Sequence, residues 1–119
     1  MTGTFLSSLH VEKVVGGWVL TDPLSYYSPM LKDTITVPTG FLTDFASVPR
    51  MPFVFLLFGD VAHEAAVIHD YLYKARWLSR READGVLLEA LEAAGVSWWR
   101  RWPMWAAVRV FGGAFFGGR

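Results

Sequence analysis

In the first third of the chain, short β-branched and aromatic runs are separated by glycine, proline and polar residues, a pattern typical of strands, and Asp33–Val37 also alternates between polar and apolar residues. Five short strands are expected, over His10–Val15, Trp18–Thr21, Leu24–Ser28, Asp33–Val37 and Phe41–Asp44. Gly16-Gly17 separates the first two strands, and a Gly-Gly pair accepts the positive φ angles of a tight hairpin. Residues 1–50 are therefore predicted to form an antiparallel β-meander.

After residue 60 the periodicity changes to that of helices. Asp60 is a suitable N-cap for an alanine-rich helix over Val61–Arg76. A second helix is expected after Ser79, because Ser79 and Glu82 have the spacing of a capping box. Its apolar residues recur at helical spacing as far as Gly95, where a helix is expected to stop. Since only a few residues connect the two helices, we expect them to be antiparallel neighbours.

The last segment, Ser97–Gly113, interleaves tryptophan with arginine. The residues concerned are Trp98, Trp99, Trp102, Trp105, Arg100, Arg101 and Arg109. Pro103 in this segment is expected to break or to begin a helix. Three interpretations are open: core packing with arginines extended to solvent, an interfacial patch for a lipid surface, or a docking surface in an assembly.

Length and composition limit the number of domains and exclude some functions. The chain has 119 residues and is 53% hydrophobic, which suits a single domain over residues 1–119 with one modest core. Because the predicted strands precede the predicted helices, the expected fold class is α+β. In it the β-meander of residues 1–50 packs against two or three helices from residues 61–113. A formal net charge of zero argues against nucleic acid as a partner, and the absence of cysteine excludes disulfides and thiolate metal sites.

Leader and anchor segments are not expected. The first ten residues lack the basic and long apolar regions of a signal peptide. The uncharged apolar runs, such as Met51–Gly59, are far shorter than the roughly 20 residues of a membrane-spanning helix.

The candidate chemistry is concentrated in the first helix. His69 and Tyr73 are four residues apart and share a helix face. If the second helix is antiparallel, Asp84 near its start lies within reach of both. A histidine with one ring nitrogen held by a carboxylate is the usual arrangement of a general base, so His69, Asp84 and Tyr73 are the candidate catalytic residues. The alternative is that these residues form a buried polar network that stabilises the fold without catalysis. The nearby basic cluster is expected to be a solvated face; its members are Lys74, Arg76, Arg80 and Arg81.

A second carboxylate, Asp70, remains for a divalent metal ion. With Asp44 and loop carbonyls it offers an all-oxygen ligand set, which suits calcium. With His63 or His69 it suits zinc or manganese instead. Calcium is the first expectation, and zinc or manganese the second. His63 also fits an ordinary residue of the first helical turn.

Several short motifs resemble one family of unknown function. They are Val37-Pro38-Thr39-Gly40-Phe41, Thr43-Asp44-Phe45-Ala46-Ser47-Val48-Pro49, the run AAVIHDYLY from Ala65 to Tyr73, Arg81-Glu82-Ala83-Asp84, and Ala107-Val108-Arg109 with Phe111-Gly112. Together they look like a small domain-of-unknown-function family that is common in tailed bacteriophages and prophages. The resemblance implies a phage or prophage origin, synthesis in the host cytoplasm, and virion or lysis proteins as partners.

A second resemblance is local. His69-Asp70-x-x-Tyr73 on one helix, followed by Asp84 on an antiparallel helix, is similar to the phospholipase A2 site. The similarity implies that His69 activates water, that Asp70 binds calcium, and that Tyr73 donates a hydrogen bond to Asp84. The glycine-rich calcium loop and the stapling cysteines of that family are absent.

Two functions of different classes follow. The first is a metal-dependent hydrolase that acts on a lipid or cell-envelope bond, with His69 as the base and a membrane surface or the cell envelope as its partner. The second is a non-enzymatic virion protein, in the tail or baseplate, whose histidine and aspartate residues only hold the helices together.

Overall fold

Two small antiparallel sheets form the N-terminal part of the protein. The computed structural model describes residues 3–43, 63–76 and 78–111. One sheet has the order β1-β4-β5, and the other has the order β2-β3-β6. The strands are β1 (Thr4–Phe5), β2 (Val11–Val14), β3 (Gly17–Leu20), β4 (Leu24–Ser28), β5 (Asp33–Val37) and β6 (Leu42–Thr43). The predicted strands therefore exist, but they are divided between two sheets, and β1 is an addition that the pattern did not indicate.

The β2–β3 hairpin turns one residue earlier than predicted. Val14 is opposite Gly17 in the ladder, so the loop is Val15-Gly16 and Gly17 already belongs to β3. Gly16 has a φ of 94°, which glycine adopts readily because it has no Cβ. Val15, the other residue of the loop, has a fully exposed side chain. The glycine pair predicted the hairpin correctly, and the strand pairing decided its position.

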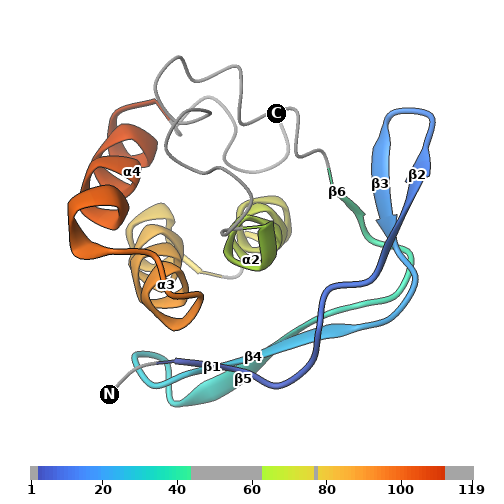
Figure 1. Cartoon of the computed structure of the whole chain (residues 1–119), viewed down its shortest axis with the longest axis horizontal. Helices are drawn as coiled ribbons and strands as arrows, with labels where there is room; N and C mark the ends of the chain where they lie inside the picture. The colour runs from blue at the N-terminus through green and yellow to red at the C-terminus, as the bar shows by residue number, and fades with distance from the viewer. Residues whose placement is uncertain (1–2, 44–62, 77, 112–119) are drawn as a thin grey trace.

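The β4–β5 hairpin supplies the sheet face that the helices cover. Leu24 and Tyr26 of β4 are buried, as are Ile35 and Val37 of β5, and the residues between them are more exposed. This alternation follows from the period of two along a strand, which turns one set of side chains to the core. In Figure 1 the three helices lie on one side of this sheet, and β2 and β3 extend beyond its end.

The described residues after β6 form three helices: α2 (His63–Ala75), α3 (Arg80–Ala93) and α4 (Trp98–Phe111). The capping box of α3 is confirmed, because Ser79 Oγ accepts a hydrogen bond from the Glu82 backbone and the Glu82 carboxylate accepts one from the Ser79 backbone. The predicted stop is confirmed too. Gly95 has a φ of 86° and donates to the Glu92 carbonyl, and Val96 donates to the Leu91 carbonyl.

Pro103 lies inside α4, so the expectation that it breaks or begins a helix is wrong. The helix begins earlier, at Trp98, where the Ser97 carbonyl accepts hydrogen bonds from the backbones of Arg100 and Arg101. A proline lacks the N–H that would reach the carbonyl of Trp99, four residues before it. Both Trp99 and Pro103 are exposed, so water can reach that carbonyl and the helix continues.

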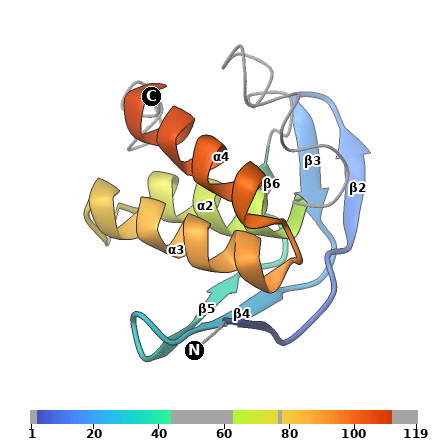
Figure 2. The ribbon, with the colours of Figure 1, turned by 60° about the vertical axis from the view of Figure 1, so that its left-hand side comes forward.

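The core lies between the β1-β4-β5 sheet and the helices. α2 and α3 are antiparallel, since Tyr73 bonds Asp84 at one end of the pair while Glu64 and Ala94 lie together at the other. α4 packs along α3 (Figure 2), in agreement with the expected α+β domain with two or three C-terminal helices. None of the helices in the described ranges combines the length and the apolarity needed to cross a membrane.

Candidate functional site

A fully buried carboxylate, Asp84, is the centre of the candidate site. It lies in the second turn of α3, and its side chain has no exposed surface. Among the residues that the structure describes, it is the only buried side chain with a formal charge. A buried carboxylate is costly unless hydrogen bonds and opposite charges compensate for the lost water, so its partners are informative.

One oxygen of Asp84 faces two side chains of α2. His69 Nε2 lies 2.7 Å from Asp84 Oδ1, and the Tyr73 hydroxyl donates a hydrogen bond to the same oxygen. The two α2 rings also contact each other, with centroids 4.1 Å apart. This arrangement follows from the sequence, because residues four apart share a helix face and Asp84 is near the start of the antiparallel neighbour.

The other oxygen of Asp84 faces cations of α3 and α4. Arg109 Nη1 donates to Asp84 Oδ2 over 2.7 Å, and Arg80 Nε lies 4.0 Å from the same oxygen. Arg80 also donates to the main-chain carbonyls of Val108 and Arg109 near the end of α4. Asp84 thus joins three helices through its two oxygens.

These partners keep Asp84 ionised. Burial alone would raise the pKa of the Asp84 carboxyl, but the hydrogen bonds from His69, Tyr73 and Arg109 and the charge of His69 outweigh it. The pKa of Asp84 therefore lies below its ordinary value. Burial and the neighbouring carboxylate raise the pKa of the Tyr73 phenol well above its usual range, so this hydroxyl remains a hydrogen-bond donor.

The geometry specifies how His69 could act as a base. Asp84 occupies Nε2, so a proton could be exchanged with a substrate or water only at Nδ1. The carboxylate fixes the ring and stabilises the imidazolium that a proton transfer creates. His69 is 12% exposed, which leaves part of its side chain accessible from outside the core.

Asp70, the expected metal ligand, faces the β sheet instead. Its Oδ2 accepts a hydrogen bond from Thr43 of β6 over 2.9 Å and lies 3.4 Å from Lys74 Nζ. Lys74 also donates to the Leu42 carbonyl, so Asp70 helps attach β6 to α2. In this arrangement the ammonium group of Lys74 already supplies the positive charge that a metal ion would bring.

His63, another expected ligand, lies apart from Asp70 along α2. His63 is the first residue of α2, two helical turns from Asp70, which corresponds to about 10 Å along the axis. Asp44 lies outside the described residues. Within residues 3–43, 63–76 and 78–111, no three histidine, aspartate or glutamate side chains are grouped in a way that could hold a metal ion.

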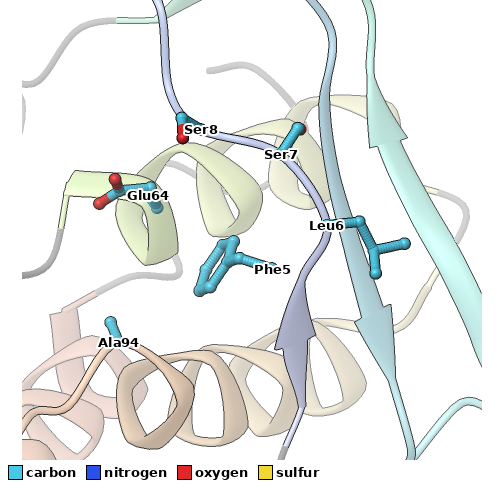
Figure 3. Close-up of a pocket in the computed structure, with 6 residues that line it drawn as sticks. All are labelled: Phe5, Leu6, Ser7, Ser8, Glu64 and Ala94. Carbon is cyan, nitrogen blue, oxygen red and sulfur yellow. The ribbon is translucent and has the colours of Figure 1, made fainter.

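A surface hollow lies at the opposite end of the α2–α3 pair from Asp84. Its volume is about 390 Å³, and it is lined by Phe5, Leu6, Ser7, Ser8, Glu64 and Ala94. Figure 3 shows the Phe5 ring directed toward the gap between α2 and α3, with Leu6 on the other side of the strand. His69, Tyr73 and Asp84 do not line this hollow, so the candidate chemistry and this concave surface are separate features.

The sequence predicted half of this cluster and missed the rest. The contacts of Asp84 with His69 and Tyr73 are as expected. From the sequence, Arg109 was assigned to the tryptophan segment and Arg80 to a solvated face. In the structure Arg109 donates a hydrogen bond to Asp84, and Arg80 donates one to the Val108 carbonyl near the end of α4. Arg80 precedes Asp84 by four residues, a spacing that indicates an ion pair, whereas no sequence spacing connects Arg109 with Asp84.

Comparison with known proteins identifies a family and no activity. The family model described as "Protein of unknown function (DUF1353)" matches residues 18–108, a range that includes His69, Tyr73 and Asp84. No curated protein and no solved structure matches the chain significantly.

Proposed function

The chain belongs to the DUF1353 family, and we propose that it is a small phage- or prophage-encoded hydrolase in which His69 is the general base. The observation that carries the proposal is the 2.7 Å contact of His69 Nε2 with the buried Asp84 carboxylate. A lipid or cell-envelope ester is the proposed substrate, in line with the phospholipase A2-like spacing of His69, Tyr73 and Asp84. The phage origin is proposed from the motifs that resemble a phage-associated family.

In the proposed reaction His69 Nδ1 removes a proton from water, and the water oxygen attacks the carbonyl carbon of the ester. The C–O bond to the alcohol breaks as the tetrahedral intermediate collapses, and the imidazolium returns its proton to the leaving oxygen. Asp84 stabilises the imidazolium between these steps. Tyr73 and Arg109 hold the Asp84 carboxylate ionised and in place, so they act as positioning residues.

A dependence on a divalent ion remains a prediction, with Asp70, Asp44 and His63 as the expected ligands. The contacts of Asp70 with Lys74 and Thr43 both involve Oδ2, and the ammonium group of Lys74 beside that oxygen would repel a metal ion. We therefore assign no step of the reaction to a metal.

The test is hydrolysis of a fluorogenic phospholipid ester, presented in mixed micelles, by the wild type and by His69→Gln. His69→Gln should lower turnover by about 100-fold or more, which is the range for loss of a general base. Glutamine retains a hydrogen-bonding group beside Asp84, so melting and circular dichroism should change little. His10→Gln, at an exposed position before β2, is the matched control and should leave turnover unchanged. Wild-type turnover in His69→Gln would overturn the proposal.

A second candidate function is a non-enzymatic tail or baseplate protein. It is favoured by the occupation of both Asp84 oxygens by side chains from three helices, because such a network stabilises a fold without any chemistry. In that case His69→Ala should mainly lower the free energy of unfolding, by about 1–3 kcal/mol through an unsatisfied carboxylate oxygen. The protein should also be detected by mass spectrometry in purified virions.

A further inference from the structure

The surface hollow at the end of the α2–α3 pair has a lining of mixed chemistry and a single sign of charge. Its lining includes the aromatic ring of Phe5, the hydroxyls of Ser7 and Ser8, and the carboxylate of Glu64 (Figure 3). Among the described residues that line it, none is lysine, arginine or histidine. Its volume of about 390 Å³ is near the small end of the range for ligand pockets, about 300–1,000 Å³, so the hollow suits a small ligand.

The Glu64 carboxylate has no protein partner in the described part of the chain. It forms no ion pair and accepts no hydrogen bond there, although its side chain is partly buried. The other glutamates of the three helices do have partners, and they are Glu82, Glu89 and Glu92. A carboxylate that is partly removed from water and lacks an opposite charge favours a cation beside it.

The helix ends at the hollow do not reverse this negative charge. α2 begins here with its partial positive end, and α3 ends here with its partial negative end, so the two largely offset each other. Arg101, which follows α3 in the chain, donates hydrogen bonds to the Val96 carbonyl and to the Glu92 carboxylate. The charge of Glu64 therefore sets the sign of the hollow.

The wall opposite the helices is held in place by neighbouring groups. The Phe5 ring packs against Tyr26, with centroids 4.8 Å apart, and the Tyr26 hydroxyl donates to the Glu89 carboxylate over 2.7 Å. Ser7 Oγ accepts a hydrogen bond of 2.9 Å from a backbone N–H of β4, which fixes the chain after β1. The exposed Ser8 hydroxyl makes no hydrogen bond within the described residues. A wall that is already ordered loses little entropy when a ligand binds.

We propose that this hollow is a binding site for a primary alkylammonium ion. An ammonium group carries one positive charge and three N–H donors, which match the Glu64 carboxylate and the Ser8 hydroxyl. The Phe5 ring adds attraction, because a cation is drawn to the face of an aromatic ring. An anion would be repelled by Glu64, and a neutral ligand would leave the charge of Glu64 without a partner. The site is at the other end of α2 and α3 from Asp84, so the inference goes beyond the proposed hydrolase and does not depend on it.

The experiment is a titration of the isotope-labelled full chain with n-butylammonium chloride at constant ionic strength, followed by amide chemical shifts. The amides of Phe5, Ser8, Glu64 and Ala94 should shift and saturate, and neutral n-butanol at the same concentrations should not produce these shifts. Glu64→Gln should weaken the binding by about tenfold or more, because a charge-assisted hydrogen bond is lost. Glu12→Gln, at an exposed position of β2, is the matched control and should bind as the wild type does.

A free amine and the lysine side chain of another polypeptide both carry this ammonium group. Diaminobutane and Nα-acetyl-lysinamide, titrated in the same way, distinguish the two sources. Tighter binding of diaminobutane indicates a free amine, and tighter binding of Nα-acetyl-lysinamide indicates a lysine side chain. Either result supports an ammonium site.

Three results would overturn the proposal: no saturable shifts in the folded wild type, equal binding of n-butanol, or wild-type affinity in a folded Glu64→Gln variant. If Glu64→Gln fails to fold, Ser8→Lys is the second test, because it places a cation at the hollow and should abolish binding. Full binding by Ser8→Lys would then overturn the proposal. His69→Gln should bind n-butylammonium as the wild type does, so loss of hydrolysis in that variant and loss of amine binding in Glu64→Gln concern separate sites.

Discussion

Asp84 and Arg109 form an ion pair of 2.7 Å across 25 residues of sequence, and this pair attaches the end of α4 to the start of α3. The Asp84 side chain is fully buried and that of Arg109 is 29% exposed. The pair therefore differs from a surface salt bridge, whose contribution to stability is usually close to zero. Arg109 supplies the hydrogen bond to Asp84 Oδ2, whereas the α2 residues His69 and Tyr73 bond only Asp84 Oδ1.

Asp84→Asn should lower the free energy of unfolding by about 2–3 kcal/mol, because the amide loses charge-assisted hydrogen bonds and turns an N–H group toward donors. The measurement is urea unfolding at pH 7, together with Arg109→Gln and the double variant. The double-mutant cycle should give a coupling free energy of about 1–3 kcal/mol. Arg81→Gln, at an exposed position of the same helix, should change stability by less than about 0.5 kcal/mol. Additive effects of Asp84→Asn and Arg109→Gln would contradict the observed pairing.

The stability contributed by Asp84 should depend on pH in a defined direction. The pKa of Asp84 is lowered in the folded state, because the hydrogen bonds from His69, Tyr73 and Arg109 outweigh the effect of burial. The unfolded chain then binds the proton more readily, so acid favours unfolding. The stability difference between wild type and Asp84→Asn should be fully present above the unfolded pKa of about 3.9 and should shrink as the pH falls through the lower folded value. Unfolding curves across this range check it, and a constant difference would argue against an ionised Asp84.

Calcium, zinc or manganese should raise the melting temperature if Asp70 is a metal ligand. A ligand that binds only the folded state adds about 2.7 kcal/mol of stability at a hundredfold excess over its dissociation constant. The rise should be specific to one ion, should disappear with EDTA, and should be absent in Asp70→Asn. Asp22→Asn, at an exposed position before β4, serves as the control. If no ion changes the melting of the wild type, Asp70 acts only through Thr43 and Lys74.

Gly85→Ala should stabilise the protein, whereas Gly95→Ala should destabilise it. Gly85 lies inside α3, where alanine is favoured over glycine by about 1 kcal/mol. A Cβ there would lie 3.1 Å from Met30 Sδ, and Met30 is half exposed and flexible enough to move. Gly95 has open space around it but a φ of 86°, so alanine would be strained at this helix end. Thermal melts of both variants test the pair, and equal changes would show that backbone conformation does not decide the outcome.

The sequence by itself determined the features that depend on neighbours along the chain. The capping box at Ser79 and the stop at Gly95 are local hydrogen-bonding patterns, so they appear in the structure where they were predicted. The meeting of His69 and Tyr73 with Asp84 was also predictable, because one helical period and one short connector between antiparallel helices bring them together.

Only the tertiary structure decided which groups complete these contacts. Arg109 contacts Asp84 across 25 residues of sequence, and Thr43 contacts Asp70 across 27 residues, because the helices and strands that carry them pack together. The division of the strands into two sheets and the passage of α4 through Pro103 likewise depend on pairing and on solvent access. Such contacts are set by how whole elements pack, and no local periodicity encodes them. For the same reason, the sequence left open whether the tryptophans of α4 face the core or the solvent. The packing of Met104 and Val108 on the α3 side turned Trp98, Trp99 and Trp102 outward.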